Sequence, residues 1–181
     1  EKTVSAIADA AKRIAELVSS VKSFTHMDQG QDRSLENIED GLESTLRMLD
    51  HKLRSNKILV DKRYSPELPK LKIWAGQMNQ VLTNLLDNAI DALAHTQNPQ
   101  ITIETSVKGS YARIYIRDNG PGIPDDIKGL IFDAFYTTKG VGKGTGMGLE
   151  ISRRIIERHK GSLNVKSEPG NTEFELCLPI N

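Results

Sequence analysis

Five glycines alternate with other residues between positions 140 and 148. A glycine inside a helix or strand costs roughly 0.5–1 kcal/mol, because it loses the most conformational freedom on folding. Neither element would use five of them, so the sequence predicts a loop here. A helical pattern from Leu149 to Arg158 follows at once. A glycine-rich loop that leads into a helix N-terminus is typical of an anion-binding site, whereas a plain flexible linker would not explain two lysines and an immediate helix.

Two common phosphate loops do not match this stretch. A Walker A loop has a glycine, four residues, then Gly-Lys followed by Ser or Thr. Here Gly142-Lys143 is followed by Gly144, and position 137 is a threonine. A Rossmann loop has G-x-G-x-x-G spacing directly after a strand. This chain has G-x-G-x-G after Phe-Tyr-Thr-Thr-Lys, so we expect a phosphate loop of a third kind.

The chain before and after this loop alternates between helical and strand-like patterns. Consecutive strands joined by short turns favour antiparallel pairing, and helices packed on one face then give two layers. The prediction is an α+β fold, a two-layer α/β sandwich with a mixed, mainly antiparallel sheet and helices on one face. The expected helices are 38–53, 78–93 and 149–158, and the expected strands are 58–60, 101–105, 112–116, 163–165 and 172–178.

The first 25 residues follow a different rule. Apolar residues recur at spacings of three and four, which is a heptad seam: Val4, Ile7, Ala11, Ile14, Val18 and Val21. Three heptads are too short to be stable alone. The pattern favours a helical bundle over an ordinary amphipathic helix lying on the domain. We expect residues 1–27 to be part of a bundle, 28–34 a polar linker and 35–181 one domain.

Composition restricts the class of protein. Hydrophobic residues make up 38% of the 181 residues, enough for one core, and 24 basic residues balance 24 acidic ones. This balance does not favour nucleic acid or an anionic membrane as a partner. The single cysteine, Cys177, excludes an internal disulfide. No apolar run approaches the roughly 18 residues of a membrane span. With no signal peptide and no initial Met, we expect a cytoplasmic piece of a longer protein.

Two asparagines fall on the polar side of the helix expected at 78–93. Asn84 and Asn88 are four residues apart, so their side chains lie on one face. Asparagine is a poor helix former, and an amide oxygen suits Mg²⁺ when waters and phosphates complete its coordination. Two solvated polar residues remain the simpler interpretation of this feature alone.

A strand that ends in a carboxylate and two glycines comes next. Asp118 can accept a hydrogen bond from an exocyclic amino group such as that of adenine. Gly120 and Gly122 would let the backbone approach a flat ring. Asn-Gly and Pro-Gly are also strong turn signals, so a plain turn is the alternative.

Residues 132–139 concentrate three of the nine aromatic residues. We expect Phe132 and Phe135 to pack locally in the core. Thr137, Thr138 and Lys139 follow them and are candidates to face phosphates.

In this order the four stretches resemble the ATP-binding fold, the Bergerat fold, shared by gyrase, heat-shock chaperones, histidine kinases and mismatch-repair ATPases. Residues 84–89 resemble the N box, 118–123 the G1 box, 132–135 the F box and 142–149 the G2 box. An F box indicates the histidine-kinase branch. Residues 13–24 are similar to the second helix of the kinase dimerisation bundle.

The resemblance implies a role for each matching residue. Asp118 would bind the adenine amino group with support from Thr172, and Asn88 would ligate Mg²⁺ with Asn84 on the phosphates. Residues 140–148, with Lys139 and Lys143, would form an ATP lid. The implied ATP-binding set is Asn84, Asn88, Asp118, Gly120, Gly122, Ile123, Phe132, Phe135, Thr137, Thr138, Lys139, Gly142, Lys143, Gly144, Thr145, Gly146, Met147, Gly148, Leu149 and Thr172.

The resemblance also separates transfer from hydrolysis. Hydrolysing relatives have a glutamate base four residues before the magnesium asparagine, where this chain has Asn84. This favours transfer of the γ-phosphoryl group of ATP to a histidine, with Asn84 as the catalytic position. The implied partners are a second copy of the chain through the N-terminal helix and the receiver domain of a response regulator.

None of the four histidines fits the acceptor motif of the family, and we expect the acceptor to lie upstream of residue 1. His159 ends a predicted helix, where a partly positive imidazole would suit the helix dipole. The alternatives are a nucleotide-sensing module without catalysis, a serine kinase of the anti-sigma type, and a DNA-topology or chaperone ATPase. The histidines are His26, His51, His95 and His159.

Overall fold

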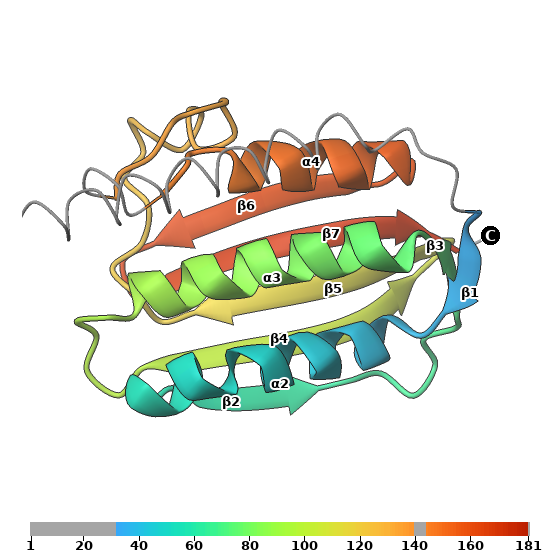
Figure 1. Cartoon of the computed structure of the whole chain (residues 1–181), viewed down its shortest axis with the longest axis horizontal. Coiled ribbons are helices and arrows are strands. Elements are labelled where there is room, and N and C mark those ends of the chain that lie inside the picture. Colours follow the sequence, from blue (N-terminus) through green and yellow to red (C-terminus); the bar gives the residue numbers. More distant parts are fainter. Residues whose placement is uncertain (1–31, 140–143, 181) are drawn as a thin grey trace, which may run out of the picture.

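The computed structural model describes residues 32–139 and 144–180. The expected helix within residues 1–27, most of the expected linker, Gly142 and Lys143 lie outside the described residues. In the described part, three helices cover one face of a five-stranded sheet (Figure 1). This is the expected two-layer α+β sandwich, and the prediction of the fold class is confirmed.

The main sheet has the strand order β2-β4-β5-β7-β6. Only the β2–β4 pair is parallel, and the other three pairs are antiparallel. The sheet is therefore mixed and mainly antiparallel, as predicted. Its strands are β2 (Leu59–Arg63), β4 (Gln100–Lys108), β5 (Tyr111–Asp118), β6 (Ser162–Glu168) and β7 (Asn171–Pro179).

The helices bury their apolar stripes on the sheet. They are α2 (Ile38–Ser55), α3 (Ala75–Ala92) and α4 (Gly148–Arg158). In α2 and α3 the buried leucines recur at the three- and four-residue spacing that predicted these helices. The strands contribute alternate residues to the same core, including Ile101, Ile103, Ile114, Ile116, Leu176 and Leu178.

The other face of the sheet is polar and ordered by ion pairs. Arg117 of β5 reaches both neighbours: its Nη1 lies 2.6 Å from Glu104 of β4, and its Nε lies 2.5 Å from Glu173 of β7. On the same face, Arg113 Nη1 of β5 lies 2.6 Å from the Glu175 carboxylate of β7. The alternation of apolar and charged residues along these strands follows from one buried and one open face.

A two-stranded sheet that the sequence analysis does not predict closes one end of the sandwich. Its strands are β1 (Ser34–Glu36) and β3 (Leu71–Ile73), which pair antiparallel. Each has three residues, too few for a recognisable period-two pattern. Leu71 and Ile73 are buried, so the pair forms part of the core.

His159 contradicts the expected positive imidazole at the end of α4. The side chain is 2% exposed, and the Trp74 backbone N–H donates to its Nε2 at 3.1 Å. Its Nδ1 lies 2.7 Å from the Ile155 carbonyl oxygen, so Nδ1 carries the proton and the ring is neutral. Burial lowers the pKa of His159, and Arg33 and Arg158 lower it further. Here desolvation outweighs the helix dipole.

Candidate nucleotide-binding site

The predicted site residues gather at one end of the two layers. In Figure 1, β5 ends on the same side of the molecule where α3 ends and α4 begins. The described parts of the segment between β5 and α4, residues 119–139 and 144–147, lie at this end. The tertiary fold therefore brings together stretches that are about 30 residues apart in the sequence.

Asp118 ends β5 with its carboxylate almost out of solvent. The residue is 5% exposed, and its Oδ1 accepts a hydrogen bond from the Gly120 backbone N–H at 3.0 Å. Burial raises the pKa of the Asp118 carboxyl from 3.8 to about 6, and the bond from Gly120 lowers it only in part. No other hydrogen bond reaches this carboxylate within residues 32–139 and 144–180. Asp118 is thus a buried acceptor that has room for a further donor.

The two glycines after Asp118 allow close approach of backbone segments. A Cβ on Gly120 would lie 2.7 Å from Asp118 Oδ1 and 3.4 Å from the Ala92 carbonyl oxygen at the end of α3. Gly122 has a φ of +83°, and a Cβ there would lie 2.6 Å from the Glu168 carbonyl oxygen. Only glycine fits at position 122, and at position 120 a Cβ would displace the Asp118 carboxylate, so both positions keep the space beside Asp118 free of side chains.

Ser167 of β6 organises this loop, although the sequence analysis does not select it. Its Oγ accepts a hydrogen bond from the Ile123 backbone N–H at 2.8 Å and lies 2.9 Å from Thr172 Oγ1. Thr172 is 4% exposed and stands opposite Asp118 in the β5–β7 ladder. Ser167 therefore links the predicted residues Ile123 and Thr172. A lone serine in a strand gives no signal in the sequence.

Asn84 joins α3 to the first turns of α4. Its Nδ2 donates to the Gly148 carbonyl oxygen at 3.1 Å and to Ser152 Oγ at 3.2 Å. No side chain caps α4 at its N-cap residue, Met147, in the described part of the chain. The first N–H groups of α4 therefore receive no hydrogen bond from an N-cap side chain, and the predicted anion site at this helix end stays a prediction.

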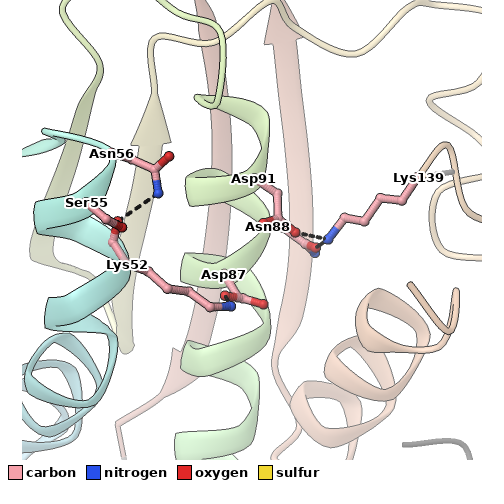
Figure 2. Close-up of polar contacts among 7 residues, drawn as sticks. All are labelled: Lys52, Ser55, Asn56, Asp87, Asn88, Asp91 and Lys139. Carbon is pink, nitrogen blue, oxygen red and sulfur yellow. Dashed lines mark hydrogen bonds and ion pairs between the residues drawn. The ribbon is translucent and has the colours of Figure 1, made fainter. Parts of the chain in front are cut away.

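Asn88 lies one turn after Asn84 and faces Lys139. The Lys139 ammonium donates to Asn88 Oδ1 at 3.0 Å and also pairs with Asp91 on the next turn of α3 (Figure 2). The predicted phosphate ligand and the predicted metal ligand are thus in direct contact. No three His, Cys, Asp or Glu side chains cluster as a metal site among the residues with described positions.

The expected core packing of Phe135 is wrong. Phe135 is 66% exposed, and its backbone has a φ of +68°. Contact here is made by the backbone: a Cβ on Gly146 would lie 2.4 Å from the Phe135 carbonyl carbon. Phe132 does pack against the core, and the Arg153 guanidinium lies 5.4 Å from the centre of its ring.

The rest of the predicted set lies along the segment that leads to α4. Thr137 Oγ1 accepts a hydrogen bond from the Lys139 N–H at 3.1 Å, and Thr138 is exposed. Thr145 Oγ1 accepts from the Met147 N–H at 3.4 Å. A Cβ on Gly144 would lie 3.1 Å from Lys139 Cδ. Met147 is buried and Leu149 packs against the core, so both anchor the start of α4.

Residues 75–181 match the family described as "Histidine kinase-, DNA gyrase B-, and HSP90-like ATPase". The chain belongs to this family. The match covers the elements from α3 to β7 and all the predicted site residues, and it leaves out β1, α2, β2 and β3. The ATPase family predicted from the four sequence stretches is confirmed.

Curated relatives point to one branch of this ATPase family. The chain is 35% identical to the sensory histidine kinase/phosphatase NtrB of Vibrio alginolyticus over 159 residues, which is 82% of this chain and 44% of that protein. It is 32% identical to NtrB of Azospirillum brasilense over 188 residues, 96% of this chain and 46% of that protein. The chain thus spans less than half the length of these two relatives.

Solved structures agree in fold. The catalytic domain of histidine kinase ThkA aligns with a TM-score of 0.74 and 29% identity, over 82% of this chain and 96% of that one. Full-length ShkA in complex with AMPPNP aligns with a TM-score of 0.82 and 25% identity, over 98% of this chain and 38% of that one. Among the described residues, no helix is long and apolar enough to cross a membrane.

Gly122 and Gly170 offer a matched test of the loop geometry, because both have positive φ and only Gly122 is crowded. Gly170→Ala should lower the free energy of unfolding by about 1–2 kcal/mol, the cost of a left-handed alanine. Gly122→Ala should lower the free energy of unfolding by about 1–3 kcal/mol more than Gly170→Ala does, because its Cβ would overlap the Glu168 carbonyl. Urea unfolding measures both. Equal losses would contradict the close approach.

Asp118→Asn should stabilise the unliganded protein at neutral pH. The raised pKa means that the native state binds a proton more tightly than the unfolded chain does, so wild type loses stability as the pH rises from about 4 through about 6. The loss amounts to about 3 kcal/mol at most, and the variant lacks it. Urea unfolding at pH 4.5 and pH 8 should therefore show a larger advantage of the variant at pH 8. An advantage that does not change with pH would refute this electrostatic account.

Proposed function

We propose that this chain binds Mg-ATP and supplies the γ-phosphoryl group for a histidine of a sensor kinase in two-component signalling. The buried Asp118 carboxylate carries the proposal, because a charge is kept out of water at the open end of the sheet with one backbone donor. Such a group is costly unless a ligand completes its hydrogen bonds. The exocyclic amino group of adenine is a donor of the right kind.

The base would enter between the loop after β5 and the end of α3. Gly120 and Gly122 leave backbone walls on which a flat ring can lie, and Thr172 stands beside Asp118 in the ladder. Ile123 packs against the core next to them and adds apolar surface. Shape and one buried acceptor together would select adenine over bases that lack an amino group at this position.

The triphosphate would lie toward α3 and the start of α4. The uncapped N–H groups at the α4 N-terminus favour negative charge, and Lys139 lies beside Asn88. Asn88 Oδ1 is a hard oxygen donor that already accepts a hydrogen bond from a cation, the Lys139 ammonium, which fits a Mg²⁺ ligand. Bound Mg²⁺ would neutralise phosphate charge, and phosphates and waters would complete its coordination.

Asn84 favours transfer over hydrolysis. An amide cannot take a proton from water as a glutamate can, and this amide donates to Gly148 and Ser152. In the transfer, an imidazole nitrogen of the acceptor would form a bond to the γ-phosphorus while the bond to the β–γ bridging oxygen breaks and ADP leaves. The chain's contribution is positioning and charge neutralisation.

The partners follow from the same proposal. The phosphorylated histidine would pass its phosphoryl group to the receiver domain of a response regulator. The heptad seam of residues 4–21 would pair two copies of the chain, so that the domain reaches a histidine of the dimer. A cytoplasmic location belongs to this proposal, because ATP and response regulators meet there.

Two single substitutions separate base recognition from metal binding. Asp118→Asn should abolish detectable ATP binding, because an amide nitrogen or neutral oxygen replaces the charged acceptor. Asn88→Ala should remove the dependence of ATP affinity on Mg²⁺, whereas Asn79→Ala, on the same helix, should leave it intact. Titration calorimetry with and without Mg²⁺ measures both. Unchanged affinity in Asp118→Asn would remove the adenine assignment.

The transfer itself is tested in the longest natural form of the protein, incubated with radiolabelled Mg-ATP. Acid-labile, base-stable label on a histidine is the expected result. Tight nucleotide binding without label would instead indicate a nucleotide-sensing module. Rapid release of free phosphate by the 181-residue chain would indicate an ATPase that hydrolyses.

A further inference from the structure

One lysine and two oxygen-bearing residues of α3 form a compact cluster at the proposed phosphate site. The Lys139 ammonium lies between Asn88 Oδ1, at 3.0 Å, and the Asp91 carboxylate (Figure 2). The Lys139 side chain is 31% exposed and that of Asp91 is 43% exposed. Asp91 follows Asn88 by three residues, so both project from one face of the helix.

Asp87, one turn before Asp91, makes a separate ion pair with α2. Its carboxylate lies 2.5 Å from Lys52 Nζ of α2, and Figure 2 shows Lys52 and Lys139 approaching the helix from opposite directions. Asp87 and Asp91 therefore carry the same charge on neighbouring turns of one helix, and each is bound to a different lysine. Of these two lysines, Lys139 is the one that also donates to an oxygen of Asn88, the proposed metal ligand.

We propose that Asp91 is a positioning residue that holds Lys139 on Asn88, so that Lys139 and Mg²⁺ compete for the same amide oxygen. The inference rests on the proposed nucleotide site. The Lys139 N–H uses one of the two lone pairs of Asn88 Oδ1, so a magnesium ion on that oxygen would lie beside the ammonium, and two cations so close would repel each other. Asp91 thereby raises the Mg²⁺ concentration at which the nucleotide binds.

Displacement gives the lysine a second role. With Mg²⁺ held on Asn88 Oδ1, the ammonium of Lys139 would be free to pair with a phosphate of the same nucleotide. The lysine then exchanges one set of oxygens for another without leaving this end of the site. Metal and triphosphate would bind together rather than one after the other. The metal would displace Lys139 from Asn88, and the phosphates would offset the positive charge of both cations.

The test compares Asp91→Asn with Asp87→Asn, which removes the same charge one turn earlier. ATP affinity of the 181-residue chain is measured by titration calorimetry over a series of Mg²⁺ concentrations. In Asp91→Asn the half-saturating Mg²⁺ concentration should fall about two- to five-fold relative to Asp87→Asn, as expected for loss of a partly exposed ion pair. An unchanged value would overturn the proposal, and a higher value would make Asp91 a metal ligand and overturn it as well.

The wild-type titration separates the two levels of inference. If the wild-type chain binds ATP with a Mg²⁺ dependence that both variants share, the nucleotide site stands and only the role of Asp91 fails. If the wild-type chain binds no ATP at any Mg²⁺ concentration, the proposed function fails, and the competition at Asn88 fails with it.

Discussion

The burial of one carboxylate, that of Asp118, governs how this end of the molecule is built. Burial raises its pKa toward neutrality, which means that the ionised form is disfavoured in the folded protein. The surroundings offer it the Gly120 backbone N–H and keep bulky side chains away through Gly120 and Gly122. An arrangement that lowers stability and leaves an acceptor incompletely satisfied is typical of a binding site, where the ligand supplies the missing donor.

Helix α3 connects this carboxylate to the residues proposed to contact phosphate. Its apolar stripe fixes it on the sheet, and its polar residues recur one turn apart along the opposite side. Asn84 bonds to the start of α4, Asn88 and Asp91 bind Lys139, and Ala92 lies against Gly120. A single helix therefore sets the distances between the proposed base, metal and phosphate positions. Sites on such elements are held more accurately than sites on loops.

Much of this could be predicted because the signals are local and repeat with a known period. The helices 38–53, 78–93 and 149–158 agree with α2, α3 and α4 to within a few residues. The pair β1–β3 was missed because three-residue strands carry no periodicity. The predictions for Phe135 and His159 are wrong because residue type alone does not give burial. Phe135 has a positive φ and is exposed, whereas His159 is buried and its pKa is lowered.

Local sequence patterns were enough to predict the alternation of helices and strands, the glycine-rich loop before a helix, and the order of four stretches that marks the ATPase family. Helical and strand periods, glycine costs and turn residues act between near neighbours, so they can be read along the chain. Three sets of contacts depend instead on how the layers pack. Ser167 supports Ile123 and Thr172, Asn84 bonds to α4, and Lys139 contacts Asn88 and Asp91. These contacts join residues from 5 to 64 positions apart. Their partners are chosen by how the layers pack, which no local pattern records.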